Sequence, residues 1–160
     1  ITKLRKEIPS VSIRTSLIVG FPGETEEQFQ ELVQFVQEYP LDNVGIFKFS
    51  REPGSYAYEL PNQIPEEVKE ERYHRLMKVQ QKTVKKQLKK MKGKKIPVMV
   101  EGYPPETELL MIGRHAGQCP DIDGQVIIND GRLVKAFGEI YLVEITDQTD
   151  YDLIGRVVKS

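Results

Sequence analysis

Apolar residues in the first third of the chain follow two periodicities. Residues 11–19 and 44–50 are rich in β-branched and aliphatic side chains, which is typical of buried strands. Between them, apolar side chains recur at helical spacing on one face: Phe29, Leu32, Val33 and Val36. Pro40 is expected to close this helix. A strand, a helix and a second strand in succession predict a βαβ unit with parallel strands.

A long helix is predicted to begin near Glu66, after a loop rich in proline and glycine over residues 51–65. Acidic residues occupy its first turn and lysines occupy its far end, which complements the helix dipole. One apolar stripe follows this helix: Tyr73, Met77, Val84, Leu88 and Met91. Gly93 is the expected stop.

The remainder of the chain alternates between short apolar runs and turn residues. Five strands are expected, at residues 96–103, 109–113, 125–129, 139–146 and 153–158. Short strands at such close spacing predict a small antiparallel barrel of the OB-like type. The predicted fold class is therefore α/β, followed by a small all-β barrel.

The formal net charge of −1 conceals three differently charged parts. Residues 66–95 hold 12 Lys and Arg against 4 Asp and Glu, whereas residues 96–160 hold 5 against 11 and residues 1–65 hold 6 against 9. A basic middle between acidic flanks indicates three parts, of which 66–95 is a linking basic helix. No apolar run approaches the ~20 residues that a bilayer-spanning helix needs, so no membrane partner is expected.

The most specific stretch is the turn after the first strand, residues 18–25, with the sequence IVGFPGET. Its glycines would let the backbone approach a ligand closely, and a turn that leads into a helix presents free N–H groups. Thr25 and Gln28 have the spacing of a capping box. Loops that follow parallel strands meet at one face, so residues 20–24 and 50–54 are expected neighbours. A tight turn that only caps the helix explains the same residues equally well.

These motifs occur in the same order in a known family. The sequence RTSLIVGFPGETEE at residues 14–27 resembles the late-barrel motif of the radical-SAM methylthiotransferases. Residues 44–50, VGIFKFS, resemble the next strand of that family, and residues 68–77 resemble its connecting helix. The final part, including PDIDG at residues 120–124, resembles its C-terminal TRAM domain.

The resemblance implies a fold and an activity. Residues 1–65 would be the C-terminal part of a radical-SAM (β/α) barrel, and residues 96–160 would be a TRAM domain. The parent enzyme would use S-adenosylmethionine and add a methylthio group to an aspartate of a small-subunit ribosomal protein. No residue of this chain is assigned as a general acid, a general base or a nucleophile.

In this family the late strands line the S-adenosylmethionine site. The resemblance therefore implies that this chain contributes Ile18, Gly20, Phe21, Gly23, Glu24, Phe47, Lys48 and Phe49 to that site. The broader radical-SAM pattern at this strand is Gly-x-Ile-x-Gly-x-x-Glu. Here Ser16 replaces the first glycine, and Glu24 lies one place late.

The family also holds two [4Fe–4S] clusters on two sets of three cysteines, whereas this chain has one cysteine, Cys119. The cluster ligands are therefore expected before Ile1, and the chain is interpreted as truncated or processed. A single free thiol fits a reducing, cytoplasmic setting.

No metal site is predicted in this chain. His74 and His115 lack partners at ligand spacing. The sequence DIDG at residues 121–124 lacks the remaining oxygens of a calcium loop and is predicted to be a turn.

Two kinds of partner fit the charge pattern. The acidic residues 96–160 suit a basic small-subunit ribosomal protein. The eight lysines of residues 82–95 could contact RNA, although a solvated helix end explains them too. The alternatives are a fragment of a tRNA methylthiotransferase, a free-standing OB-like RNA-binding module, and a structural fragment without activity.

We predict that the 160-residue chain binds no iron–sulfur cluster and has no methylthiotransferase activity, because one cysteine cannot hold a cluster. Anaerobic reconstitution followed by iron and sulfide analysis measures this. A stoichiometric cluster on the monomer would contradict the prediction.

Overall fold

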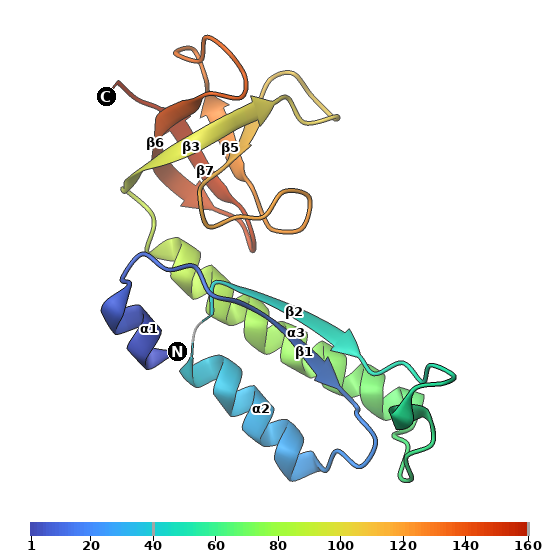
Figure 1. Ribbon diagram of the computed structural model, residues 1–160. Helices are drawn as coiled ribbons and strands as arrows, with labels where there is room; N and C mark the ends of the chain where they lie inside the picture. Colours follow the sequence, from blue (N-terminus) through green and yellow to red (C-terminus); the bar gives the residue numbers. More distant parts are fainter. Residues whose placement is uncertain (40, 160) are drawn as a thin grey trace. The chain divides into compact units, whose positions relative to one another are not determined.

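A computed structural model describes residues 1–39 and 41–159 (Figure 1). The elements in chain order are α1 (Thr2–Glu7), β1 (Arg14–Val19), α2 (Glu26–Glu38), β2 (Asn43–Lys48), η1 (Tyr56–Tyr58), α3 (Glu66–Lys89), β3 (Lys95–Gly102), β4 (Met111–Arg114), β5 (Val126–Asp130), β6 (Ile140–Gln148) and β7 (Leu153–Val157). The chain divides into two compact units, Ile1–Thr83 and Val84–Ser160. No helix among the described residues has the length and apolar character required to span a bilayer.

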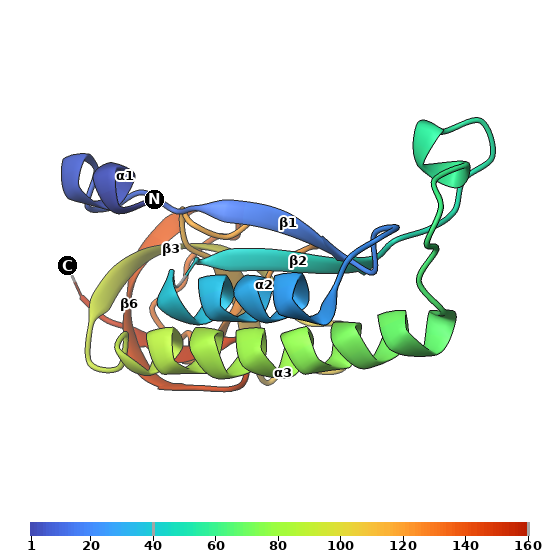
Figure 2. The same ribbon diagram turned by 90° about the horizontal axis from the view of Figure 1, so that it is seen from below.

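The first unit contains the predicted βαβ arrangement. Strands β1 and β2 pair in parallel, with Ile18 opposite Phe47 in the register. One face of this sheet packs on the helices, because Val19 and Ile46 are buried in a common core with Phe29 of α2. Figure 2 shows α2 and α3 on that same side of the sheet. The α/β part of the prediction is thus confirmed, although no complete (β/α) barrel lies within the described chain.

Helix α2 begins as the sequence predicted. The Thr25 hydroxyl accepts a hydrogen bond from the Gln28 N–H at 3.2 Å, and the Gln28 side chain accepts one from the Thr25 N–H at 3.0 Å. The helix ends at Glu38. The predicted stop, Pro40, lies outside the described residues.

Helix α3 begins at Glu66, as predicted, and its apolar stripe contributes to two cores. Tyr73 and Met77 pack against the core of the first unit, whereas Leu88 and Met91 pack against the core of the second. The helix ends at Lys89, and Gly93 follows with a positive φ of 82°. Glycine adopts this conformation without the steric cost that a side chain would add.

The second unit is a closed five-stranded barrel with the order β3-β4-β5-β7-β6. Its five strands lie within three residues of the predicted ranges at each end. Four of the five pairings are antiparallel, but β5 and β7 pair in parallel. The prediction of an antiparallel barrel was therefore wrong at one pairing, because a closed barrel with an odd number of strands cannot alternate strand direction all the way round.

The barrel interior is filled by alternate, mostly β-branched side chains from all strands except β4, which contributes Gly113. The buried residues are Val98, Val100, Val126, Ile128, Val143, Ile145, Leu153 and Val157. Gly155 of β7 leaves no room for a side chain, since an added Cβ would lie 2.6 Å from Val143 Cγ1 and 2.7 Å from the Glu144 carbonyl oxygen. A glycine is therefore required at this position, where β7 pairs with β6.

We predict that Gly155→Ala lowers the free energy of unfolding of the barrel by about 1–3 kcal/mol, the usual cost of overpacking a core. Arg156→Ala is the matched control, because Arg156 is the next residue of β7, points outward and makes an exposed ion pair with Glu144. That control should cost less than about 1 kcal/mol. Urea unfolding of the chain measures both, and equal midpoints for Gly155→Ala and the unmodified chain would contradict the prediction.

Candidate functional site

The site residues predicted from the sequence meet at the C-terminal ends of β1 and β2. The Phe49 N–H donates a hydrogen bond to the Val19 carbonyl at 2.9 Å, which continues the pairing past the strand ends. The rings of Phe21 and Phe49 make an edge-on contact with centroids 5.3 Å apart. The loops that follow the two strands are therefore neighbours, as the parallel pairing predicted.

An apolar strip lies on the sheet face opposite the helices. Ile18 and Phe47 are adjacent in the register, and these residues are 54% and 56% exposed. The Phe47 ring reaches back over Gly45, where an added Cβ would lie 3.0 Å from the ring edge. Two large apolar side chains on an uncovered sheet face form a surface that could contact a flat, apolar group.

The environment of Gly20 differs from the one that the sequence predicted. Gly20 has a positive φ of 75°, so a glycine is favoured by the backbone alone. The direction in which its side chain would point is filled by the aliphatic stem of Lys69 from α3. Close approach of a ligand from that side is excluded, and Gly20 is required for the approach of α3.

The backbone N–H groups of this turn are also engaged within the chain. The Gly20 N–H donates to Glu24 Oε1 at 3.0 Å, the Gly23 N–H to the Asn62 carbonyl at 2.9 Å, and the Glu24 N–H to the Phe21 carbonyl at 2.9 Å. The expectation of free N–H groups was therefore wrong for these three residues. A ligand at this turn would therefore contact the side chains on the uncovered sheet face and not these N–H groups.

Lys48 contacts the first turns of α3. Its ammonium group makes an ion pair with Glu66 at 2.9 Å and a hydrogen bond with Glu70. These hydrogen bonds, to Glu70 first and then Glu66, raise the pKa of Lys48 above its ordinary value. Lys48 thus stays charged, and its charge is already compensated by two carboxylates.

Two residues of α3 were not predicted as part of this site. Lys69 packs under Gly20, and Arg72 makes a hydrogen bond to Glu24 Oε1 at 2.6 Å. In the sequence they belong to a helix rich in charged residues, and exposure of that helix to solvent would explain their presence. The spacing of three between them, which places them on one helix face, was the only signal that could have indicated a shared contact.

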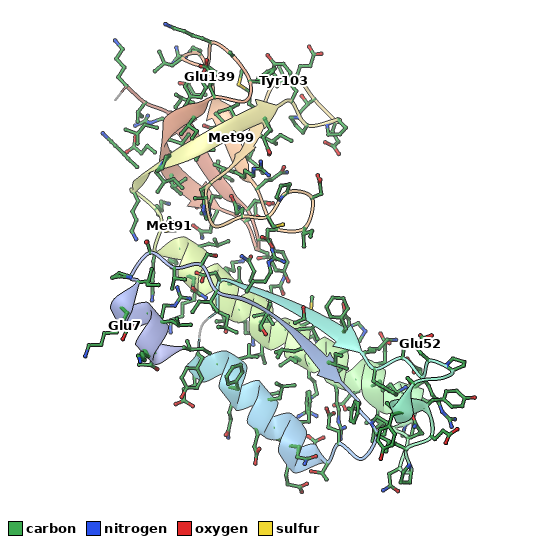
Figure 3. All side chains as sticks on the ribbon, in the orientation of Figure 1. Glu7, Glu52, Met91, Met99, Tyr103 and Glu139 are labelled. Carbon is green, nitrogen blue, oxygen red and sulfur yellow. The ribbon has the colours of Figure 1, made fainter. Side chains whose placement is uncertain are left out.

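The barrel carries a second exposed apolar surface. The rings of Tyr103 and Phe137 pack edge to face with centroids 5.2 Å apart, and both remain exposed. Ile140 is also exposed and pairs with Met99 in the β3–β6 register. Figure 3 shows Tyr103 and Glu139 at the same end of the barrel, with Met99 midway along β3. This surface combines apolar side chains with at least one carboxylate.

The lysines of residues 82–95 are all exposed, but two of them have acidic partners in the barrel. Lys85 makes an ion pair with Asp150 at 2.7 Å, and Lys92 makes one with Asp147 at 3.7 Å. Both carboxylates lie in or beside the connection between β6 and β7. These two lysines therefore contribute to the contacts between the helix end and the barrel.

The loop before β5 is a turn held by its own acidic residue. The Asp123 carboxylate accepts a hydrogen bond from the Cys119 N–H at 2.7 Å, and Asp121 has a positive φ of 61°. Across the part of the chain that the structure describes, no three His, Cys, Asp or Glu side chains are grouped as metal ligands. Cys119 is exposed and carries a free thiol.

Comparisons with known proteins match both units. Residues 93–158 match the TRAM domain family. The chain is 82% identical over 158 residues to the ribosomal protein uS12 methylthiotransferase RimO of Protochlamydia amoebophila, a match that covers 99% of this chain and 33% of the relative. It is 53% identical to RimO of Chlamydia abortus, a match that covers 100% of this chain and 35% of the relative. It is 49% identical to RimO of Myxococcus xanthus, a match that covers 99% of this chain and 33% of the relative.

The similarity extends over both units, because each alignment spans at least 158 of the 160 residues. The chain spans about a third of the length of these relatives. It is therefore similar along its whole length to one part of the RimO proteins, and it contains a TRAM domain at residues 93–158.

Proposed function

We propose that this chain is the C-terminal part of a cytoplasmic methylthiotransferase that modifies an aspartate of ribosomal protein uS12. The first unit would contribute part of the S-adenosylmethionine site, and the TRAM barrel would dock the protein substrate. The observation that carries this proposal is the uncovered apolar face at the C-terminal ends of β1 and β2, in a chain that is 82% identical to a uS12 methylthiotransferase.

The first unit has the layering of one sector of a (β/α) barrel. Parallel strands carry helices on one face, and in such barrels the other face points inward while the loops after the strands form the active site. Ile18 and Phe47 lie on the face that would point inward. We propose that residues 1–65 are the C-terminal part of such a barrel, whose other strands belong to the rest of the parent protein.

The residues at this end fit the apolar part of S-adenosylmethionine. Ile18 and Phe47 supply exposed apolar surface for an adenine ring, and Phe21 and Phe49 hold the two loops together beside it. Bound S-adenosylmethionine would supply the reactive sulfonium, and this chain's own residues would orient it. Gly20, Gly23, Glu24 and Lys48 would act indirectly, by shaping the turn and the strand ends.

The two [4Fe–4S] clusters of the parent do not fit this chain. A cluster of this kind requires three closely spaced cysteines, and Cys119 is the only cysteine here. We propose that both sets of ligands lie in the part of the parent protein that this chain does not include. The function of this chain is therefore to position substrates and not to hold iron.

We predict that Phe47→Ala weakens binding of S-adenosylmethionine by the full-length protein roughly tenfold, because a desolvated aromatic contact is lost. Phe137→Ala is the matched control, since it removes a similarly exposed aromatic ring from the TRAM barrel. Equilibrium dialysis measures both affinities. Equal dissociation constants for the two variants would remove the reason for placing the site on this face.

The TRAM barrel has the surface chemistry of a docking module for a basic protein. Residues 96–160 hold 11 Asp and Glu against 5 Lys and Arg. Arg114, Arg132 and Arg156 are each paired with a carboxylate, Glu101, Asp130 and Glu144. Hydrogen bonds from Arg132 lower the pKa of Asp130 to about 2, so this pair stays charged at neutral pH. The exposed Tyr103 and Phe137 rings could act as apolar anchors beside the acidic residues.

RNA is the second candidate partner, and a specific observation supports it. After Lys85 and Lys92 are paired with acidic residues, six exposed lysines remain in residues 82–95, and phosphate contacts of this kind supply most non-specific RNA affinity. This surface would also suit the tRNA-modifying alternative, or a binding module without enzymatic activity.

Two sets of substitutions distinguish these partners. We predict that Glu106, Glu108 and Glu139, changed together to Gln, weaken binding of uS12 several-fold at low salt and leave tRNA binding unchanged or stronger. Changing Lys86, Lys89 and Lys90 together to Gln should weaken only tRNA binding and reduce its salt dependence. Titrations at several salt concentrations measure both. A chain that binds tRNA more tightly than uS12 would favour the tRNA-modifying alternative.

A further inference from the structure

A buried ion pair joins two segments that lie far apart in the sequence. Arg72 of α3 donates from Nη1 to Glu24 Oε1 at 2.6 Å and to the Glu24 carbonyl at 3.1 Å. Its guanidinium also lies 3.6 Å from a Glu26 carboxylate oxygen and 5.5 Å from the centroid of the Phe29 ring. Arg72 is only 5% exposed, and the Glu24 side chain is 12% exposed. The pair is therefore largely shielded from water.

The same carboxylate oxygen holds the turn after β1. Glu24 Oε1 accepts the Gly20 N–H at 3.0 Å as well as the Arg72 guanidinium. One turn earlier on α3, the stem of Lys69 fills the space beside the Gly20 α-carbon, and its ammonium lies 5.6 Å from the Phe49 ring centroid. Figure 2 shows the segment from β1 to α2 at the same end of the unit as the first turns of α3. Helix α3 thus contacts this turn through two neighbouring residues.

Stability alone does not explain why this ion pair is buried. A buried ion pair seldom stabilises a fold more than apolar residues of the same size would, because both charges lose their water. The Nε atom of Arg72 is buried and has no hydrogen-bond partner in the described structure, which adds to that cost. The pair does fix the orientation of the two side chains relative to each other, since a guanidinium and a carboxylate meet in a narrow range of geometries.

We propose that Arg72 is a positioning residue for the S-adenosylmethionine site. Through Glu24 it fixes the turn of residues 20–23, and through that turn it fixes the end of β1 that carries Ile18. The proposal rests on the proposed function, because it requires that this strand end contacts S-adenosylmethionine. Arg72 itself contacts neither the uncovered face nor a reacting atom.

Arg75 provides a matched control on the same helix. It also carries a guanidinium close to Phe29, 4.9 Å from the ring centroid, and it also binds Glu26, at 3.1 Å. Its other partner is Glu71, at 2.9 Å, and in the described structure none of its hydrogen bonds or ion pairs is with Glu24 or Gly20. Arg75 is more exposed than Arg72, with 40% of its side chain accessible to solvent.

The test uses the full-length protein with its clusters loaded under anaerobic conditions. Binding of S-adenosylmethionine is measured by equilibrium dialysis, and KM and kcat are measured with uS12 as substrate. Arg72→Met should raise the Kd and the KM for S-adenosylmethionine roughly tenfold, because a displaced turn moves the end of β1 that carries Ile18. The same variant should change kcat at saturation less than twofold. Arg75→Met should leave both within twofold.

A double-substitution cycle tests the route through Glu24. If Arg72 acts through Glu24, then the variant that combines Glu24→Gln with Arg72→Met should bind no more weakly than Arg72→Met alone. Arg72→Lys, which keeps the charge and loses the fixed geometry, should be intermediate. If Arg72→Met does not fold, Glu24→Gln, which keeps the side-chain size, takes its place in the comparison.

Three results would overturn the proposal: an unchanged Kd in folded Arg72→Met or Glu24→Gln, an equal effect of Arg75→Met, or additive effects in the cycle. Failure of the unmodified protein to bind S-adenosylmethionine would instead overturn the proposed function. The two failures are therefore distinguishable in one set of measurements.

Discussion

The apolar stripe of α3 is the constraint on which both units depend. A two-stranded sheet with one helix buries too little apolar surface to be stable in isolation. Tyr73 and Met77 of this stripe pack, beside the fully buried Leu76, against the core that Val19 and Phe29 form, and Leu88 packs against the barrel core. One helix therefore completes two cores. Its charged residues had to be placed where they would not interrupt this stripe.

The sequence predicted most of the fold because most of it is encoded locally. The capping box at Thr25 and Gln28, the start of α3 at Glu66 and the parallel pairing of β1 with β2 all follow from short patterns. The parallel pairing of β5 with β7 does not. Short strands with alternating apolar residues specify which face is buried, but they do not specify which neighbour they join.

The turn at the candidate site could be predicted from its motif, but its hydrogen bonding could not. The turn at residues 20–24 lies where the sequence predicted, beside Phe49. Its N–H groups, however, are taken by Glu24 Oε1 and by the Asn62 and Phe21 carbonyls. Arg72 lies 48 residues beyond Glu24, and a charged residue on a charged helix carries no local sign of a distant buried partner. The assignment of Ile18 and Phe47 to S-adenosylmethionine remains a prediction.

The position of β7 between β5 and β6 has a consequence for the order in which the protein can assemble during synthesis. Strands β3, β4 and β5 can pair as soon as they leave the ribosome, and β6 can join β3, but the remaining gap is closed only by residues Leu153–Val157. Until that segment emerges, the apolar interior of the barrel and two strand edges face water. Such an open sheet is prone to wrong pairing, so the nascent chain spends this interval in its most vulnerable state. An enzyme proposed to modify a ribosomal protein would thus lack its own docking surface until the strand that closes the barrel has left the ribosome.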